Sequence, residues 1–301
     1  MSMIAVTGIT GKTGYWFYQR LISYASKHQD MSCRFASRSL NGLKFITPTE
    51  HMQYAIGDIN ESGFCKTFLD CVDTLVHIAG IRYSFPLLDI AVEKGVKRFI
   101  LVHTTGMYSK YKKAAKPYIT LEARIHELAA QHDINVTILR PTMIYGTLED
   151  RNISVFIKMV DKLHLFPVIN GAVYELQPVH AKDLGDAYFS VLMNPEITAN
   201  KEYNLSGGQP IMLIDMLKTI SKYMGKHPRF ISVPFPLAYF GACIAFYATL
   251  TKLDYREKVQ RMIEPRVFAH DSATKDFGYA PVTFQDGVKE EVLQYMRKIK
   301  Q

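Results

Sequence analysis

The sequence predicts an α/β protein with a doubly wound parallel sheet, on three observations. Short apolar runs alternate with amphipathic segments along the first half of the chain, which is typical of parallel strands joined by crossover helices. A glycine-rich turn separates the first strand from the first helix. The 301 residues are 48% hydrophobic and 21% charged, which suits one large domain or a main domain carrying a smaller one.

The strands expected in the first half are short and apolar. They are Met3–Thr7, Cys33–Ser37, Gln53–Ile56, Thr74–Ala79, Arg98–His103 and Asn135–Leu139. The helices expected between them are Thr13–Ser26, Glu61–Leu69, Pro86–Lys94 and Pro117–Gln131. Parallel strands place all their carboxyl ends at one edge of the sheet, so we expect the ligand site there.

The regular alternation of expected strands and helices becomes less clear after Arg140-Pro141. Further helices are expected at Arg151–Lys162, Ala181–Met193 and Ile211–Met224, strands at Val173–Val179 and Glu202–Leu205, and a final helix within 268–300. This half shows no convincing core of its own. We therefore expect residues 1–145 to form the main domain, and residues 146–301 to form a smaller portion that partly interleaves with it and covers its ligand.

Two phosphate-binding motifs compete for the segment VTGITGKTG, residues 6–14. A triphosphatase loop needs Gly-x-x-x-x-Gly-Lys-Ser/Thr, and its first glycine would fall on Val6, inside the strand. A dinucleotide loop fits, because Gly8 permits a tight turn, Gly11 lets the backbone approach a pyrophosphate and Gly14 lets the helix pack on the strand. We expect the loop and the following helix N-terminus to hold a pyrophosphate through Gly8, Ile9, Thr10, Gly11, Lys12, Thr13 and Gly14.

Further motifs follow in order along the chain. They are Gly57-Asp58, Ile78-Ala79-Gly80, Val102–Ser109 (VHTTGMYS), Leu139–Gly146 (LRPTMIYG), Pro178–Asp183 (PVHAKD) and Phe277–Pro281 (FGYAP). With the glycine loop, this set resembles the short-chain dehydrogenase/reductase superfamily, in its extended and atypical, epimerase/dehydratase-like branches. The resemblance covers nearly the whole chain. It implies a Rossmann-type dinucleotide-binding domain in residues 1–145 and a substrate-binding portion in residues 146–301.

The end of the second strand indicates which nicotinamide cofactor is bound. Folds that prefer NAD place a carboxylate there for the ribose 2′-hydroxyl, whereas this chain has Ser37-Arg38. A guanidinium suits a 2′-phosphate, and Lys12 could add a second cation, so we expect NADP rather than NAD. The alternative is that Arg38 stacks on the adenine and Lys12 is solvated. The resemblance adds as cofactor contacts Gly57, Asp58, Ile59, Ile78, Ala79, Gly80, Thr104, Tyr118, Pro141 and Met143.

The superfamily's chemistry uses a Ser or Thr, a Tyr that exchanges a proton with the substrate oxygen, and a Lys four residues later that lowers the Tyr pKa. The resemblance assigns the first two roles to Thr104 and Tyr118, but Glu122 stands at the lysine position. A carboxylate there disfavours the phenolate. Tyr108 and Lys112 also spell Tyr-x-x-x-Lys, but Tyr108 falls on a structural tyrosine of the family motif. Another lysine within 112–116 could supply the missing cation.

Two functions stay open. The first is an NADP-dependent oxidoreductase or epimerase/dehydratase acting on a carbonyl or hydroxyl substrate such as a nucleotide sugar, with Tyr118 as acid/base and Thr104 assisting. The second is a non-catalytic NADP-binding regulatory or accessory protein, similar to the NmrA-type regulators or the dinucleotide-binding accessory subunit of respiratory complex I. Glu122 favours the second, while the retained Tyr118, Thr104 and substrate region favour the first, which we prefer.

The formal net charge of +8, with lysines gathered in 110–116, favours an anionic small-molecule substrate. The basic clusters lie in no nucleic-acid recognition module, and the four cysteines are too scattered for a metal site. We therefore expect neither nucleic acid nor metal as a partner.

The segment 235–250, FPLAYFGACIAFYATL, has no charged residue but is shorter than the roughly 20 residues that a membrane span needs. We expect a buried or substrate-covering helix there, with peripheral membrane contact as the alternative. Because the first strand begins at once and the cysteines read as reduced thiols, we expect a cytoplasmic protein. A homodimer, common in the superfamily, is the remaining expectation.

Overall fold

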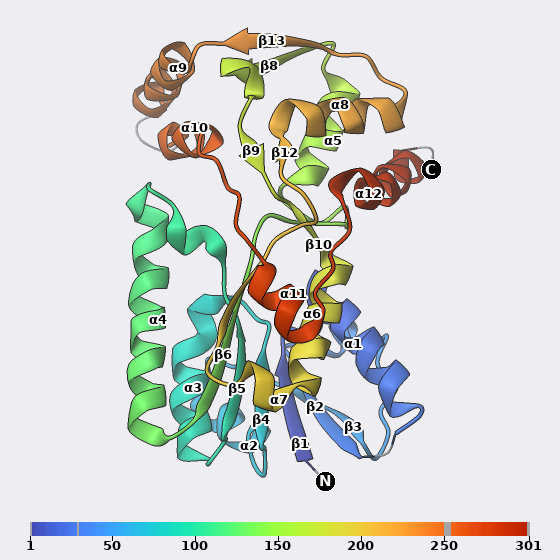
Figure 1. Cartoon of the computed structure of the whole chain (residues 1–301), viewed down its shortest axis with the longest axis vertical. Helices are drawn as coiled ribbons and strands as arrows, with labels where there is room; N and C mark the ends of the chain where they lie inside the picture. The colour runs from blue at the N-terminus through green and yellow to red at the C-terminus, as the bar shows by residue number, and fades with distance from the viewer. Residues whose placement is uncertain (1, 29, 250–253, 300–301) are drawn as a thin grey trace.

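A seven-stranded parallel sheet forms the centre of the computed structural model, which describes residues 2–28, 30–249 and 254–299 (Figure 1). In chain order its strands are β1 Ser2–Thr7, β2 Met31–Ser37, β3 Met52–Ile56, β4 Thr74–His77, β5 Arg98–Val102, β6 Asn135–Pro141 and β11 Glu202–Leu205. Their order in space is β11-β6-β5-β4-β1-β2-β3, and all neighbours are parallel. The predicted doubly wound sheet is therefore confirmed, and its strand order reverses between β1 and β4, where such folds bind ligands.

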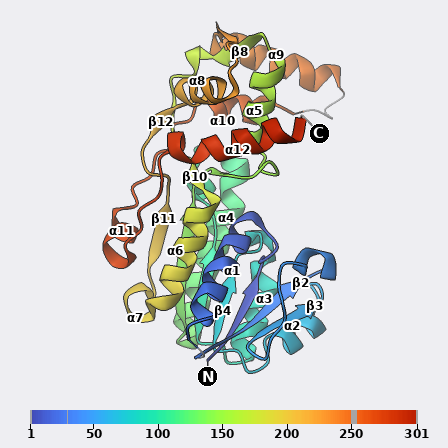
Figure 2. The ribbon, with the colours of Figure 1, turned by 90° about the vertical axis from the view of Figure 1, so that its right-hand side faces the viewer.

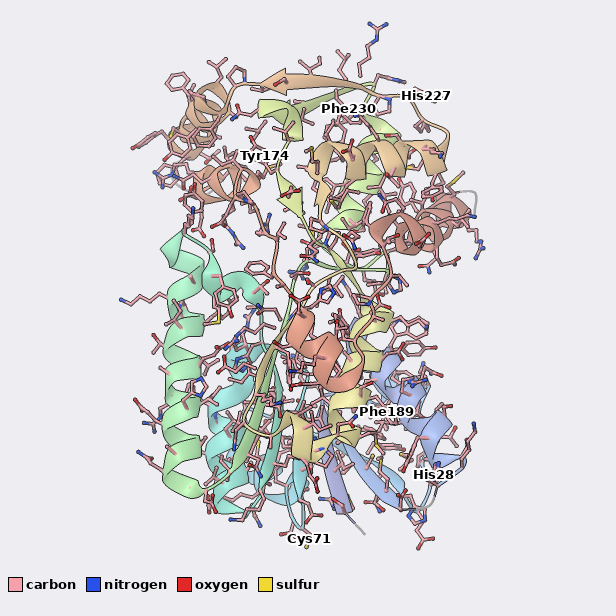
Figure 3. The ribbon with its side chains drawn as sticks, in the orientation of Figure 1. His28, Cys71, Tyr174, Phe189, His227 and Phe230 are labelled. Carbon is pink, nitrogen blue, oxygen red and sulfur yellow. The ribbon has the colours of Figure 1, made fainter. Side chains whose placement is uncertain are left out.

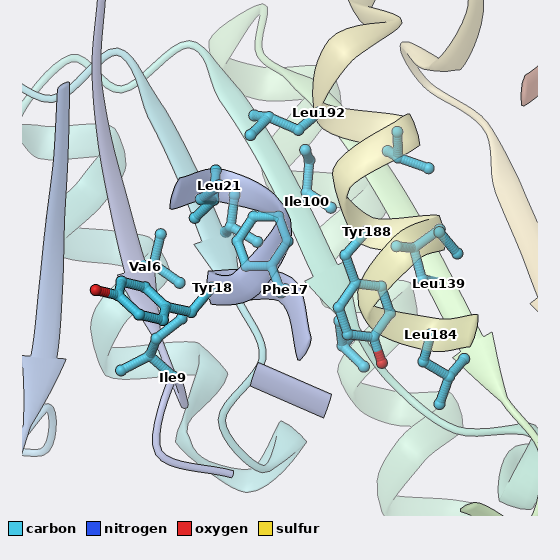
Figure 4. Close-up of a cluster of buried hydrophobic side chains, with 14 of the residues drawn as sticks. Val6, Ile9, Phe17, Tyr18, Leu21, Ile100, Leu139, Leu184, Tyr188 and Leu192 are labelled. Carbon is cyan, nitrogen blue, oxygen red and sulfur yellow. The ribbon is translucent and has the colours of Figure 1, made fainter. Parts of the chain in front are cut away.

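Helices cover both faces of this sheet. The helices α1 (Lys12–Ala25) and α6 (Ala181–Met193) pack on one face, around the apolar cluster of Figure 4. They approach closely because Gly185 has no side chain, since a Cβ there would lie 2.6 Å from the Phe17 backbone nitrogen. The other face is covered by α2 (Ser62–Phe68), α3 (Ser84–Glu93) and α4 (Lys112–His132).

A second layer of elements lies beyond the carboxyl edge of the sheet (Figure 2). The helices α5 (Ile153–Lys162), α8 (Leu213–Met224) and α12 (Phe284–Ile299) bury a cluster of their own. The expectation that this half has no core is therefore wrong. The cluster is assembled from segments that are spread over more than a hundred residues of the chain, so no local periodicity reveals it.

Three short strand pairs connect this layer. Parallel pairs form between β7 (Ile144–Tyr145) and β10 (Val179–His180), and between β8 (Leu165–Ile169) and β13 (Arg229–Val233), and an antiparallel pair joins β9 (Glu175–Leu176) and β12 (Ile211–Met212). The expected strand Val173–Val179 is thus two strands, β9 and β10. Phe230 of β13 packs on Phe166 with ring centroids 5.6 Å apart, and Figure 3 shows Phe230 and Tyr174 at this end of the molecule.

The second half of the chain also returns to the main sheet. It supplies β11, and Tyr203 on that strand donates a hydrogen bond of 2.7 Å to Asp276 of α11 (Asp271–Phe277). Tyr279 joins the core that contains β1. The remaining helices are the short α7 (Pro195–Thr198), then α9 (Phe235–Ala248) and α10 (Arg256–Met262).

Two expected helices differ from the structure. The helix α4 begins at Lys112 and not at Pro117; a proline is favoured in the first turn, but here the helix extends more than a turn before it. The helix α9 is not buried, since Ala242 is its one buried residue. Across the described ranges, the helices are too short or too polar to cross a membrane.

Candidate cofactor and substrate site

A cavity of about 850 Å³ opens at the carboxyl edge of the sheet, where the strand order reverses. It is lined by the turns after β1, β2, β3 and β4 and by the segment that follows β6. The lining residues are Thr7, Gly8, Thr10, Gly11, Lys12, Thr13, Ala36, Ser37, Arg38, Gly57, Asp58, Ile59, Asn60, Ile78, Ala79, Gly80, Thr142, Met143, Ile144, Glu149, Arg151 and Asn152. We call it the first cavity.

The glycine loop has the geometry that a pyrophosphate cradle needs. Gly8 has φ +75°, and a Cβ there would overlap the Ala79 backbone nitrogen. Gly11 donates its N–H to the Gly8 carbonyl at 2.9 Å, and a Cβ on Gly14 would overlap that same carbonyl. The helix α1 starts at Lys12 with neither a side-chain cap nor an acidic residue in its first turn. Its first N–H groups therefore fit an anion.

Most of the predicted cofactor residues line the first cavity, and five do not. Ile9 is fully buried in the core, and Gly14 packs against the loop. Pro141 is buried, and its carbonyl accepts a hydrogen bond from Thr105 Oγ1 at 3.2 Å. Thr104 and Tyr118 line other cavities, described below.

The two predicted phosphate-binding cations have different surroundings. Arg38 is exposed and, within the described part of the chain, has no hydrogen-bond or ion-pair partner. Lys12 is half-buried, and burial lowers the pKa of its ammonium group. The nearby acidic residues Asp150, Glu149 and Glu291 act in the opposite direction, but burial outweighs them. The Arg38 guanidinium is therefore free to bind a ligand, whereas the Lys12 ammonium is attracted electrostatically by acidic residues on the other wall of the cavity.

One of those acids, Glu291, ties the C-terminal helix to the cavity wall. It is fully buried on α12, where its Oε2 accepts a hydrogen bond from Gly146 N at 2.8 Å. Burial raises its pKa to about 9, and the neighbouring Asp150 adds to the shift. The Asp150 carboxylate accepts bonds from the N–H groups of Asn152 (2.6 Å) and Ser154 (3.1 Å). A protonated Glu291 beside Asp150 thus holds the loop that carries Glu149, Arg151 and Asn152.

A second cavity, of about 350 Å³, adjoins the first. The two share Thr142, Met143 and Asn152. The other residues of the second cavity are Thr104, Thr105, Gly106, Tyr108, Ser109, Lys110, Leu176, Gln177, Arg261, Glu264, Pro265, Arg266, Val267 and Phe268. The cavity therefore brings one cation from the segment after β5, Lys110, together with Arg261 and Arg266 of the C-terminal region.

Hydrogen bonds hold the wall of the second cavity in place. Glu264 accepts from Ser109 Oγ at 2.8 Å and from Lys110 N at 2.6 Å. The guanidinium groups of Arg261 and Arg266 lie near each other on this wall. Burial lowers the Arg266 pKa, and the positive charge of Arg261 lowers it further. Such a pair suits a phosphate or carboxylate group.

Thr104 and Tyr118 lie on two sides of one turn. Thr104 lines the second cavity, and its Oγ1 accepts a hydrogen bond from Gly106 N at 3.0 Å. Tyr118 lines a third cavity of about 680 Å³ between α3 and α4, with Ile81 and Phe85. A Cβ on Gly106 would lie 3.2 Å from Thr104 Oγ1 and 3.4 Å from Tyr118 Cε2. The two predicted catalytic side chains are therefore neighbours, but they line different cavities.

Glu122 does not take the place of a catalytic lysine at the cofactor cavity. It is 3% exposed, and Arg140 Nε donates to both of its carboxylate oxygens at 3.0 Å. His103 Nδ1 lies 2.9 Å from Oε1. Burial alone would raise the pKa of Glu122, but the hydrogen bonds of His103 and Arg140 outweigh it and leave the pKa below its ordinary value. Glu122 is thus an ionised partner of Arg140.

The ion pair extends to the edge of the sheet. Arg140 Nη2 also lies 2.6 Å from Glu202 Oε2, and Glu202 Oε1 lies 2.9 Å from His126 Nε2. The lysines that could replace the missing cation divide into two groups: Lys116 lines the third cavity, whereas the side chains of Lys112 and Lys113 lie outside the described part of the structure.

Sequence reasoning missed several residues of this site. Glu149, Arg151 and Asn152 line the first cavity, and Arg261 and Glu264 the second. The first three follow closely after the Leu139–Gly146 motif, so their position after β6 could have indicated that they line the site. Glu291 and Arg261 lie far along the chain in segments without a motif. Within the described residues, His, Cys, Asp and Glu form no group of three or more placed to hold a metal ion.

Comparisons with known proteins agree with this geometry. The model of the NAD dependent epimerase/dehydratase family matches residues 4–206. The chain is 21% identical over 332 residues to UDP-glucose 4-epimerase of Vibrio cholerae, covering 98% of this chain and 95% of that protein.

Two solved structures share the fold over almost their whole length. One is UDP-glucuronic acid 4-epimerase of Bacillus cereus in complex with UDP-glucuronic acid and NAD, with a TM-score of 0.76, 15% identity and 99% of each chain covered. The other is dTDP-glucose 4,6-dehydratase of Streptomyces venezuelae with NAD bound, with a TM-score of 0.76, 18% identity and coverage of 99% of this chain and 98% of that one. The predicted resemblance to the extended short-chain dehydrogenases is confirmed, and the chain belongs to the NAD dependent epimerase/dehydratase family.

Proposed function

We propose that this protein is an NADP-dependent enzyme that acts on a carbonyl or hydroxyl group of a nucleotide sugar. The observation that carries the proposal is the meeting of two cavities at Thr142, Met143 and Asn152. The first has the glycine cradle of a dinucleotide, and the second has the cations Lys110, Arg261 and Arg266 around a pocket suited to a substrate phosphate.

Each wall of the site has a role in this proposal. The glycine loop and the N-terminus of α1 bind the cofactor pyrophosphate. The free guanidinium of Arg38 binds the 2′-phosphate and selects NADP, although the two solved neighbours described above hold NAD. The nicotinamide, when bound, supplies the hydride chemistry. Arg261 and Arg266 bind the anionic part of the substrate, and Thr104 hydrogen-bonds the reacting oxygen.

Tyr118 is the proposed proton carrier for that oxygen. It lies one turn before Glu122 on α4, and it flanks Gly106 opposite Thr104. The buried Arg140–Glu122 pair fixes this part of α4 on the sheet, so it positions Tyr118 rather than touching the substrate. The proton transfer then proceeds without the usual lysine partner.

A second function, non-catalytic binding of NADP, is favoured by one specific observation. Tyr118 lines the third cavity and not the cavities proposed for cofactor and substrate. With Glu122 engaged by Arg140, an NADP-holding regulatory or accessory protein would need no further chemistry. The homodimer expected from the resemblance stays a prediction for either function, and analytical ultracentrifugation tests it.

Binding and turnover separate the two functions. Titration of the purified protein with NADPH and NADH measures cofactor affinity, and the proposal expects tighter binding of NADPH. Incubation with cofactor and a panel of UDP- and dTDP-hexoses, followed by chromatography of the nucleotide sugars, detects epimerised, dehydrated or reduced products. Tight NADPH binding without any product across the panel would favour the non-catalytic function.

A further inference from the structure

The second cavity holds an acidic residue of the chain itself among its cations. Of the charged residues that line it, Lys110, Arg261 and Arg266 are basic and Glu264 is acidic. Glu264 is only 8% exposed, and its negative charge acts on the Arg266 guanidinium. A carboxylate therefore already lies in the cavity that we propose for the anionic part of the substrate.

Two donors from the segment after β5 bind the Glu264 carboxylate. Its Oε2 accepts a hydrogen bond from Ser109 Oγ at 2.8 Å, and its Oε1 accepts one from the Lys110 backbone N–H at 2.6 Å. Ser109 Oγ in turn accepts from the Tyr111 N–H at 3.3 Å, so its own proton is left to point at the carboxylate. A hydroxyl and an N–H that converge on the oxygens of one anion bind a phosphate in the same way.

The segment that carries Glu264 is lightly packed. The helix α10 ends just before Glu264, and none of its residues is buried. Figure 1 shows α10 above the upper end of α4. On the other side of Glu264, the Arg266 N–H donates to the Glu175 carbonyl of β9 at 2.9 Å. Elements with few buried side chains open at a low cost in free energy, so α10 can move while Arg266 stays attached to β9.

The cavity keeps unused capacity for an anion although Glu264 is in place. The Nε atoms of Arg261 and Arg266 are buried and have no hydrogen-bond partner among the described residues. The cavity volume of about 350 Å³ is at the lower end of the roughly 300–1,000 Å³ that is usual for pockets that bind small molecules. Displacement of the Glu264 carboxylate would enlarge the cavity and free the two donors, and it would leave the surrounding cations without an opposing charge.

We propose that Ser109 Oγ and Lys110 N are the donors of a phosphate subsite in the second cavity, and that Glu264 occupies this subsite as a latch until the substrate displaces it. A phosphate of the nucleotide sugar then accepts the two hydrogen bonds and pairs with the neighbouring cations, while the Glu264 side chain swings away and loosens α10. This inference rests on the proposed function, because it takes the second cavity as the place of an anionic substrate. It adds an internal carboxylate that competes with the substrate and so sets the affinity of the site.

Calorimetric titration with UDP and with inorganic pyrophosphate tests the latch. The full chain is first saturated with NADP, so that neither probe binds in the glycine cradle of the first cavity. Glu264→Gln removes the charge of the latch and weakens both of its hydrogen bonds, whereas Glu264→Asp keeps the charge but is one methylene too short to reach both donors. Because the latch competes for the subsite, both variants should bind UDP and pyrophosphate at least about fivefold more tightly than the wild type.

Ser109→Ala tests the donor assignment. In the Glu264→Gln background, where the latch is already weakened, loss of the Ser109 hydroxyl should lower UDP affinity about tenfold. Glu257→Gln is the matched control, because Glu257 is an acidic residue of α10 that does not line the second cavity; this variant should bind UDP like the wild type. None of the three residues lines the first cavity, so NADP titration and circular dichroism show whether each variant keeps its fold.

The results that would overturn the latch differ from those that would overturn the proposed function. UDP affinity that is unchanged or lower in both Glu264 variants would make Glu264 a purely structural link between α10 and the segment after β5. A rise confined to Glu264→Gln would reduce its role to the overall charge of the cavity, and an unchanged affinity on adding Ser109→Ala would remove Ser109 from the subsite. If UDP and pyrophosphate bind to none of these proteins, the proposed substrate site is wrong and the latch with it.

Discussion

Arg140 engages both carboxylate oxygens of Glu122, with its Nε 3.0 Å from each. The first residue lies on β6 and the second on α4, so this buried ion pair joins the sheet to the helix that carries Tyr118. The position where the superfamily pattern has a lysine is thus part of an internal ion pair. Its carboxylate is matched by a guanidinium and does not face the cofactor cavity.

Removal of the Glu122 carboxylate should destabilise the fold. Glu122→Leu leaves the Arg140 guanidinium buried with Glu202 as its remaining partner, and we expect a loss of about 3 kcal/mol in the free energy of unfolding. Urea denaturation measures it. Glu202→Gln is the control, because Glu202 is partly exposed and its loss should cost about 1 kcal/mol or less. Equal effects of the two variants would contradict the central role of the Glu122 pair.

Glu122→Lys should not restore the superfamily's chemistry. The new ammonium would lie against Arg140 in a buried place, and like charges repel strongly there. We therefore expect a protein that unfolds at lower urea concentration than Glu122→Leu and that shows no gain in turnover. A stable Glu122→Lys protein with raised activity would place residue 122 at the cofactor after all.

Glu291 should make stability fall as pH rises. Its pKa in the folded protein is about 9, above the ordinary value of 4.5. The contribution of its protonated form is complete below pH 4.5 and is lost as the pH rises from 4.5 toward 9. Glu291→Gln keeps a neutral group beside Asp150, so at pH 8 the variant should be more stable than the wild type by roughly 5 kcal/mol, at about 1.4 kcal/mol for each pH unit above 4.5. Denaturation of both proteins at pH 5 and pH 8 should show the gap widening with pH; a constant gap would contradict it.

Arg38 should decide the preference between the two nicotinamide cofactors. Arg38→Ser removes the free guanidinium at the end of β2, and NADPH affinity should fall about tenfold or more while NADH affinity changes little. Lys44→Ser, an exposed cation shortly after, is the matched control. Lys12→Met should change the NADPH/NADH ratio less, since Lys12 is drawn to Asp150 and its acidic neighbours. An unchanged ratio in Arg38→Ser would favour adenine stacking.

Gly8→Ala should abolish cofactor binding. A side chain at φ +75° is strained, and the added Cβ would overlap the Ala79 backbone. We expect a loss of about 1–3 kcal/mol in stability and no measurable NADPH binding. Gly63→Ala on α2 is the control, because a Cβ there meets nothing within 4 Å; this variant should be as stable as the wild type or more so. NADPH titration that gives wild-type affinity for Gly8→Ala would contradict the cradle.

The sequence predicted the sheet well because strands and crossover helices leave local signals. All six strands expected in the first half are present, and β11 and α6 have the predicted bounds. The core around α5, α8 and α12 was missed, since its members come from distant segments. The apolar composition of α9 was evident, but composition does not tell what covers a helix.

The site was predicted to the extent that it lies on motifs. The glycine loop and the turns after β2, β3 and β4 line the first cavity as expected. The partners of Glu122 could not be predicted, because Arg140 lies on β6 and contacts it where α4 packs on the sheet. No fixed spacing in the sequence relates two residues that meet in this way. Glu291 reaches its place from a helix about 140 residues beyond the loop that it holds.

The most direct test of the central claim is the rate of product formation by the wild type and by Tyr118→Phe, with NADP(H) and the nucleotide sugar that the panel identifies. The matched control is Tyr54→Phe, on β3 and away from the cavities. General acid–base catalysis by Tyr118 predicts a loss of about 100-fold or more at unchanged cofactor affinity, with the control at the wild-type rate. Equal rates for wild type and Tyr118→Phe would contradict the claim.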